Sequence, residues 1–229
     1  ARIALTAVLR EQGAYDASLA QARSALVTQP GNLEALLEVG RIYREKGDLD
    51  VAELVFKKAL SLDERKAVTH NDLGLLELAR GDTQLAFSHF EQAVSLDSKF
   101  TAARMNRASV LLRAGDYAAA EAEYQKVLAV DASTAPARVG LGIALRGKGK
   151  HREAEKAYEA VLEASPNDPD ALFNLAVLRA EFLDQRPRAR ALFERYLEVA
   201  ATDDTHRTAA ERYLAQLPTT ESSAEGATP

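Results

Sequence analysis

The sequence contains no cysteine and no tryptophan, and only 6% of its 229 residues are aromatic. Without cysteine, these residues cannot form a disulfide framework, a thiolate zinc site or a cysteine nucleophile. No run of about 18 apolar residues occurs, so we expect no segment to insert directly into a membrane as a helix. Acidic residues outnumber basic ones and give a net charge of −5. This balance argues against a broad phosphate-binding face, and we expect no nucleic acid partner.

The residues that are present favour helices. Hydrophobic residues make up 47% of the chain although aromatics are few. The difference is made up largely by alanine, which has the highest intrinsic helix propensity. This composition predicts an all-α protein.

Glycines recur with a fixed spacing of 34 residues, at Gly13, Gly47, Gly81, Gly115 and Gly149. Numbering each of them as position 15 of a repeat reveals other constant positions. Position 8 is small, with Gly40, Gly74, Ala108, Gly142 and Ala176. Position 20 is also small and position 24 is mostly aromatic, as in the pairs Ala52 and Phe56, Ala86 and Phe90, Ala120 and Tyr124, and Ala154 and Tyr158. Self-similarity at such a period indicates a repeat architecture.

Within one repeat the apolar spacing predicts two helices. Leu36, Val39, Gly40 and Tyr43 recur at i, i+3, i+4 and i+7, which places them on one helical face. We expect Gly47 to end that helix, because glycine adopts the left-handed conformation after a helix without strain. A second amphipathic helix then follows, with small residues that let the paired helices approach closely.

This pattern resembles the tetratricopeptide repeat (TPR) family of helix-turn-helix units. The resemblance covers residues 1–203, although tryptophan is missing at position 4 and proline at position 32 in three repeats. It implies a right-handed α-solenoid of about six TPR repeats, at 1–32, 33–66, 67–100, 101–134, 135–168 and 169–203. We expect residues 204–217 to form a polar-faced capping helix and residues 218–229 to be a disordered tail.

The resemblance also implies that the first helices of the repeats line a concave groove, with positions 5, 6 and 9 among those facing it. The candidate groove residues are Leu37, Arg41, Asn71, Leu75, Met105, Asn106, Val139, Ile143, Phe173, Asn174 and Val177. We expect the third to sixth repeats to bind an apolar or amphipathic segment of a partner protein, with asparagine amides setting its direction. The alternative is that some of these side chains pack between helices and the groove is only partly apolar.

Some TPR proteins bind the acidic C-terminus of heat-shock chaperones with a clamp of lysine, arginine and asparagine side chains. The corresponding positions here hold Leu37, Arg41, Asp72, Ala102 and Asn106. This set lacks most of the clamp, so we expect no binding of such a carboxylate tail.

No motif predicts catalysis, a cofactor or a metal. The segment GIALRGKG imitates a phosphate-binding loop, but Gly149 stands where the metal-binding Ser or Thr should follow Lys148. Its glycines Gly142 and Gly147 occupy helical positions of the repeat, so we interpret them as packing residues. The four histidines are scattered along the sequence. We therefore expect a non-enzymatic protein.

The leading hypothesis is a scaffold or adaptor that holds a partner segment in the groove. The alternative is a structural subunit of a larger assembly that uses its convex face or its ends. The irregular sixth repeat resembles bacterial TPR proteins, including envelope lipoproteins of pilus or gliding-motility machinery. Because the sequence starts with Ala1 rather than Met, we expect an upstream segment, where an anchoring cysteine would lie. Envelope and cytoplasm remain equal alternatives, and the sequence names neither the partner nor the oligomeric state.

Overall fold

The computed structural model describes residues 2–217, and the expected disordered tail lies outside this range. All regular elements in the described range are α-helices, which confirms the all-α prediction. The helices are α1 (Arg2–Glu11), α2 (Tyr15–Thr28), α3 (Leu33–Glu45), α4 (Leu49–Leu62), α5 (Ala67–Arg80), α6 (Thr83–Leu96), α7 (Thr101–Arg113), α8 (Tyr117–Val130), α9 (Ala135–Gly147), α10 (His151–Ala164), α11 (Pro169–Glu181), α12 (Arg186–Val199) and α13 (Arg207–Gln216).

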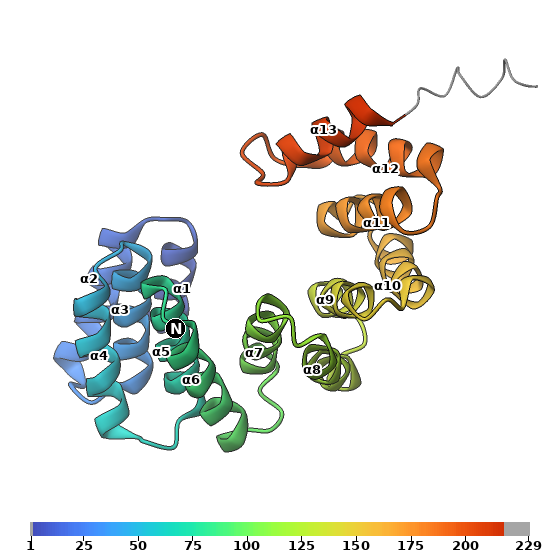
Figure 1. The fold of residues 1–229 in the computed structure, drawn as a ribbon. Coiled ribbons are helices and arrows are strands. Elements are labelled where there is room, and N and C mark those ends of the chain that lie inside the picture. Colours follow the sequence, from blue (N-terminus) through green and yellow to red (C-terminus); the bar gives the residue numbers. More distant parts are fainter. Residues whose placement is uncertain (1, 218–229) are drawn as a thin grey trace, which may run out of the picture. The chain divides into compact units, whose positions relative to one another are not determined.

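The chain forms two compact units, an N-terminal unit of residues 1–110 and a C-terminal unit from residue 111. In the N-terminal unit, helices α2 and α4 each pack against the first helix of their own pair and against that of the next pair (Figure 1). The first helices α1, α3 and α5 also contact one another directly. The C-terminal unit repeats this arrangement, with α9 against α11. The first helices therefore form a layer of their own within each unit.

The five spaced glycines do what the sequence predicts. Each has a positive φ, between 73° at Gly13 and 87° at Gly81, and each follows the end of a first helix. Only glycine reaches this conformation without strain from a Cβ atom. The start of several helices is fixed by an Asn or Asp side chain that accepts a hydrogen bond from the backbone three residues on, as Asn32 and Asp168 do.

The two helices of a repeat are held close together by an aromatic ring lying on a glycine. A Cβ atom added to Gly40 would lie 2.3 Å from the Phe56 ring, and one added to Gly74 would lie 2.5 Å from the Phe90 ring. Both rings are completely buried. The glycine is required because the ring occupies the space that any side chain would need.

The same contact explains the GIALRGKG segment. Gly142 lies within α9, and its Cα faces the ring of Tyr158, which a Cβ would approach to 2.4 Å. Gly147 is the last residue of α9 and faces Tyr117. This segment is therefore a helix and not a phosphate-binding loop, as the repeat position of its glycines predicted.

The last repeat and the cap depart from the regular pattern. Helix α11 ends at Glu181 and α12 begins at Arg186, with Asp184 at a φ of 51° between them. The capping helix is shorter than expected, because residues 204–206 form a loop before α13. Asp204 holds this loop in place, since its carboxylate accepts hydrogen bonds from the Tyr196 hydroxyl at 2.5 Å and from the His206 backbone at 2.8 Å.

The contact between Gly74 and Phe90 predicts the effect of one added methyl group. Gly74→Ala should lower the free energy of unfolding by about 1–3 kcal/mol through overpacking, despite the better helix propensity of alanine. Gly31→Ala is the matched control, since a Cβ there meets nothing within 4 Å and the glycine has no positive φ. Urea unfolding followed by circular dichroism measures both. Equal stabilities of the two variants would show that the ring does not require the glycine.

The different surroundings of two buried tyrosines predict that removing the hydroxyl has opposite effects on stability. The Tyr158 hydroxyl is buried and has no hydrogen-bond partner among the described residues, whereas that of Tyr196 donates to Asp204. Tyr158→Phe should therefore leave stability unchanged or raise it by about 1 kcal/mol, while Tyr196→Phe should lower it by about 1–2 kcal/mol. Thermal melts of the two variants test this. Destabilisation by Tyr158→Phe comparable to that by Tyr196→Phe would contradict the assignment.

Candidate functional site

The candidate groove residues divide into an accessible set and a buried set. Arg41, Leu75, Met105, Asn106, Ile143 and Asn174 are half-buried and reach the surface. The others are covered, with exposed fractions of 0% for Leu37, 5% for Asn71, 6% for Val139, 8% for Val177 and 9% for Phe173. Four of the five covered residues occupy position 5 of their repeats. Position 9, in contrast, is accessible in the second to fifth repeats and covered in the sixth.

Leu37 and Val139 are core residues, which corrects the expectation that they line an open groove. Leu37 belongs to the hydrophobic cluster of Phe56 and Leu73, and Val139 belongs to that of Tyr158. The cause is the direct contact between successive first helices, such as α3 with α5 and α9 with α11. This contact encloses Leu37 and Val139 at position 5, while Arg41 and Ile143 at position 9, one turn later, remain at the surface.

Phe173 and Val177 are covered by the end of the chain. The Phe173 ring stacks on His206 with 4.4 Å between centroids and meets the Phe193 ring edge-on. Val177 belongs to the same cluster, which extends to Ala210 of α13. The loop and helix of the cap therefore cover Phe173 and Val177, which were expected to contact a partner.

The accessible residues of the N-terminal unit form what we call the first-helix patch: Arg41 of α3, Leu75 of α5, and Met105 and Asn106 of α7. The Asn106 side-chain amide donates to the Asn71 side-chain oxygen at 2.8 Å, which joins α7 to α5. Leu75 follows Asn71 by one turn and packs against the cluster of Phe90. In the C-terminal unit, Ile143 and Asn174 are accessible, and the Asn174 amide donates to the Asp170 carbonyl of its own helix at 2.9 Å.

A network of ion pairs whose carboxylates are buried borders the first-helix patch. Arg41 donates to Glu38 at 2.5 Å and to Asp72 at 2.9 Å, and Arg10 donates to Glu38 at 3.1 Å and to Glu45 at 2.6 Å. The Glu38 and Asp72 side chains are only 5% and 4% exposed. Burial alone would lower the pKa of Arg41, but the adjacent Asp72 and Glu38 carboxylates raise it above its ordinary value. The network therefore links α1, α3 and α5 through paired charges.

Arg41 was predicted from the sequence as a groove residue, but its ion pairs with Glu38 and Asp72 were not. Glu38 and Asp72 both occupy position 6 in successive repeats, beside arginines at positions 9 and 12. That pattern is the signal that would have revealed the network. It also bears on the chaperone clamp, because Asp72 already holds Arg41 and would repel a carboxylate tail. The absence of clamp binding stays a prediction.

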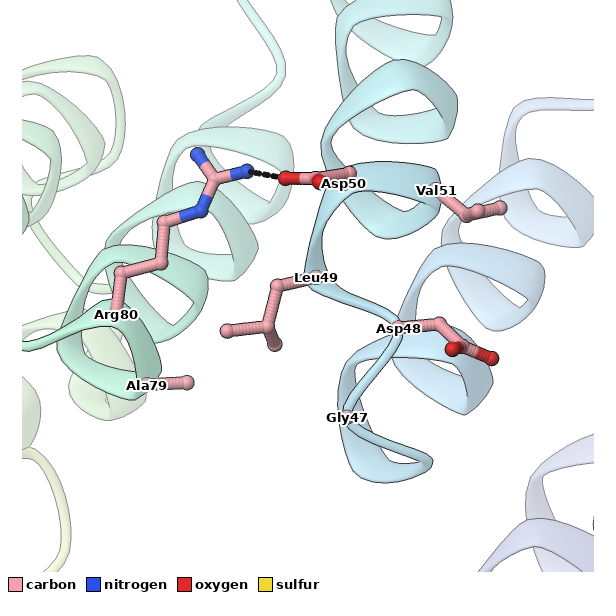
Figure 2. Close-up of a pocket in the computed structure, with 7 residues that line it drawn as sticks. All are labelled: Gly47, Asp48, Leu49, Asp50, Val51, Ala79 and Arg80. Carbon is pink, nitrogen blue, oxygen red and sulfur yellow. Dashed lines mark hydrogen bonds and ion pairs between the residues drawn. The ribbon is translucent and has the colours of Figure 1, made fainter.

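One cleft in the N-terminal unit lies on the side of the helix turns (Figure 2). It has a volume of about 670 Å³ and is lined by Gly47, Asp48, Leu49, Asp50, Val51, Ala79 and Arg80. The Leu49 and Ala79 side chains point toward each other across it, and Arg80 is engaged by Asp50 at 2.9 Å and by Glu53 at 2.7 Å. The charge of Arg80 is thus paired with carboxylates of the neighbouring helix α4.

Similar ion pairs join neighbouring repeats elsewhere. Lys148 donates to Glu121 at 2.5 Å and Arg179 donates to Glu155 at 3.0 Å, and each glutamate has the same repeat position as Glu53. Among residues 2–217, no group of three or more His, Asp or Glu side chains is arranged to hold a metal ion. No helix in that range is long and apolar enough to cross a membrane.

Comparisons with known proteins agree with this architecture. Tetratricopeptide repeat family models match residues 8–67, 100–167 and 139–205. No curated protein sequence matches the chain significantly. Among solved structures, PilF of Pseudomonas aeruginosa aligns with a TM-score of 0.77 at 16% identity, over 94% of this chain and 96% of PilF.

Two further structures are similar. PilW, a widely conserved type IV pilus biogenesis factor, has a TM-score of 0.77 and 20% identity over 91% of this chain and 96% of its own. YrrB, a TPR protein with an unusual peptide-binding site, has a TM-score of 0.63 and 20% identity over 83% of this chain and 97% of its own. At these identities the likeness concerns the fold alone.

The 34-residue period, the helix pairs and the family matches together define the class. The chain belongs to the tetratricopeptide repeat family, and its fold is an all-α TPR solenoid. Proteins of this fold are repeat scaffolds for protein–protein interaction, and this chain is such a scaffold.

The ion network predicts that removing the charge of the buried Glu38 carboxylate lowers stability more than removing that of an exposed carboxylate on the same helix. Glu38→Gln should lower the free energy of unfolding by about 1–3 kcal/mol, because two arginines lose a charged acceptor. Glu34→Gln on the exposed side of α3 should change it by less than about 0.5 kcal/mol. Urea unfolding at two salt concentrations measures both. A Glu38→Gln chain as stable as wild type would show that the network contributes nothing.

Proposed function

We propose that this protein is an adaptor that holds a segment of a partner protein against the first-helix patch. The observation that carries the proposal is the accessible apolar pair Leu75 and Met105 on a face whose charges are otherwise paired internally. Apolar side chains that remain accessible at the surface of a scaffold are candidates for burial by a partner.

The neighbouring groups define the chemistry of the segment. Leu75 and Met105 suit an apolar side chain, and the flexible thioether of Met105 can adapt to its shape. The amide of Asn106, already oriented by Asn71, can bond to a backbone or side-chain polar group beside that apolar residue. Arg41 is held by Glu38 and Asp72, so its side chain is fixed at the edge of the patch and its charge is largely neutralised. These features favour an amphipathic segment over a strongly acidic one.

A second candidate function is a structural subunit that docks folded proteins through its outer surface. Apolar side chains that support this reading are exposed on the second helices, with Leu54 of α4 70% exposed and Leu85 of α6 42% exposed. The likeness to PilF and PilW makes an envelope assembly one setting for it. In this case the sensitivity to mutation would lie on α4 and α6 and not on the first-helix patch.

The test compares charge substitutions on the two surfaces. Leu75→Glu with Met105→Glu should reduce partner capture by at least about tenfold, because a buried apolar contact becomes a buried charge. Leu54→Glu is the matched control within the same compact unit and should leave capture unchanged. Affinity capture from cells that express the protein, followed by mass spectrometry, gives the readout, and thermal melts establish that each variant is folded.

Val139 is unsuitable for this test, although its repeat position suggested it, because it belongs to the core. Met105→Glu alone is the safer variant, since Leu75 also touches the cluster of Phe90. Loss of the captured proteins with Leu54→Glu and not with the patch variants would replace the adaptor proposal with the structural subunit.

A further inference from the structure

Arg146 is a half-buried arginine of the C-terminal unit whose charge is not paired within residues 2–217. It occupies position 12 of the fifth repeat, near the end of α9. In that part of the chain, its guanidinium forms neither a hydrogen bond nor an ion pair. The sixth repeat follows, so the helix that would supply a carboxylate to Arg146 is present in the structure.

The other two arginines at position 12 face carboxylates of the next repeat. Arg10 donates to Glu38 at 3.1 Å and to Glu45 at 2.6 Å, which occupy positions 6 and 13 of the second repeat. Burial raises the pKa of Asp72, at position 6 of the third repeat, and the nearby charge of Arg44 opposes the rise. In this chain, the acidic residue at position 6 of the following repeat is therefore the partner of a position 12 arginine.

The corresponding residues of the sixth repeat form no ion pair with Arg146. Position 6 is Asn174, which is neutral and whose amide donates to the Asp170 carbonyl at 2.9 Å. Position 13 is Glu181, whose carboxylate accepts a hydrogen bond from the Tyr213 hydroxyl. Arg146 thus keeps the position of an ion-paired arginine, but a neutral amide replaces the acidic partner.

The groups around Arg146 combine this charge with an apolar side chain. Burial raises the pKa of the Tyr158 and Tyr213 hydroxyls above their ordinary values, and the charge of Arg146 opposes the rise in both. The guanidinium therefore lies near the hydroxyl ends of both rings. Ile143, three residues earlier on the same side of α9, is accessible beside it. We call Ile143, Arg146 and Asn174 the α9 patch.

We propose that the α9 patch binds a segment of a partner protein that supplies an aspartate or glutamate side chain to Arg146 and a neighbouring apolar side chain to Ile143. Arginine and a carboxylate can form two parallel hydrogen bonds, which makes such a pair geometrically specific. The second N–H of the Asn174 amide can donate to the same carboxylate. The partner would thus provide the charge that Glu38 provides to Arg10.

The composition of the remaining chain favours a partner over the chain's own C-terminal residues. Residues 218–229 contain two glutamates, but their apolar side chains are only those of alanine and proline. They offer no large side chain to cover Ile143. The α9 patch belongs to the C-terminal unit, and this proposal does not depend on the function proposed for the first-helix patch.

The first test uses a phage library of random dodecapeptides, selected on the intact wild-type chain. The selected peptides should share an aspartate or glutamate beside an apolar residue. Fluorescence anisotropy of synthetic copies should show at least about tenfold weaker binding to Arg146→Gln, and the amide form of the acidic residue in the peptide should weaken binding equally. The Leu75→Glu, Met105→Glu chain should bind these peptides normally, which separates the α9 patch from the first-helix patch.

The second test supplies the carboxylate within the chain. Asn174→Glu recreates the pairing of Arg10 with Glu38, so it should block the selected peptides. It should also have a higher melting temperature than Asn174→Gln, the matched uncharged control. This difference should disappear when both substitutions are made in the Arg146→Gln chain.

Three results would overturn the proposal. The first is a selection that yields no acidic peptides, or peptides that bind wild type and Arg146→Gln equally. The second is an Asn174→Glu chain no more stable than Asn174→Gln, because Arg146 would then not be placed to receive a carboxylate. The third is peptide binding that requires removal of residues 218–229, because the occupant would then be the chain's own C-terminal segment.

Discussion

The close approach of paired helices, made possible by a glycine under an aromatic ring in the second, third and fifth repeats, is the constraint on which the rest of the structure depends. Where Phe56 lies on Gly40 and Phe90 on Gly74, no side chain separates the paired helices. Second helices such as α4 and α10 can then contact the first helix of the next repeat as well. The first helices are thereby brought into contact with one another, and this determines which of their side chains reach the surface.

This contact between first helices divides one helical face into two parts. Residues at position 5, such as Leu37 and Val139, are enclosed, whereas position 9 residues such as Leu75 stay accessible. Paired charges around Glu38 and Asp72 neutralise the neighbouring surface, which leaves few groups that could attract a partner through charge alone. We therefore expect the apolar side chains of the first-helix patch to contribute most to partner binding.

The sequence predicted the fold well and the site only in part. The spacing of the glycines and the position of Phe56 could be predicted because they depend on backbone conformation and packing within a single repeat. The burial of Leu37 depends on the distance between neighbouring first helices, which helical periodicity does not contain. The stacking of His206 on Phe173 could not be predicted either, because it depends on how the irregular sixth repeat meets the cap.

The central functional claim, that a partner covers the first-helix patch, can be tested by the oxidation of one side chain in that patch. Met105 is the only methionine in the chain, so its oxidation by hydrogen peroxide reports on this patch alone. Mass spectrometry would follow the rate of sulfoxide formation in the free protein and in the complex with a captured partner. The account predicts that Met105 is oxidised in the free protein and protected in the complex. Oxidation at the same rate in both would contradict it.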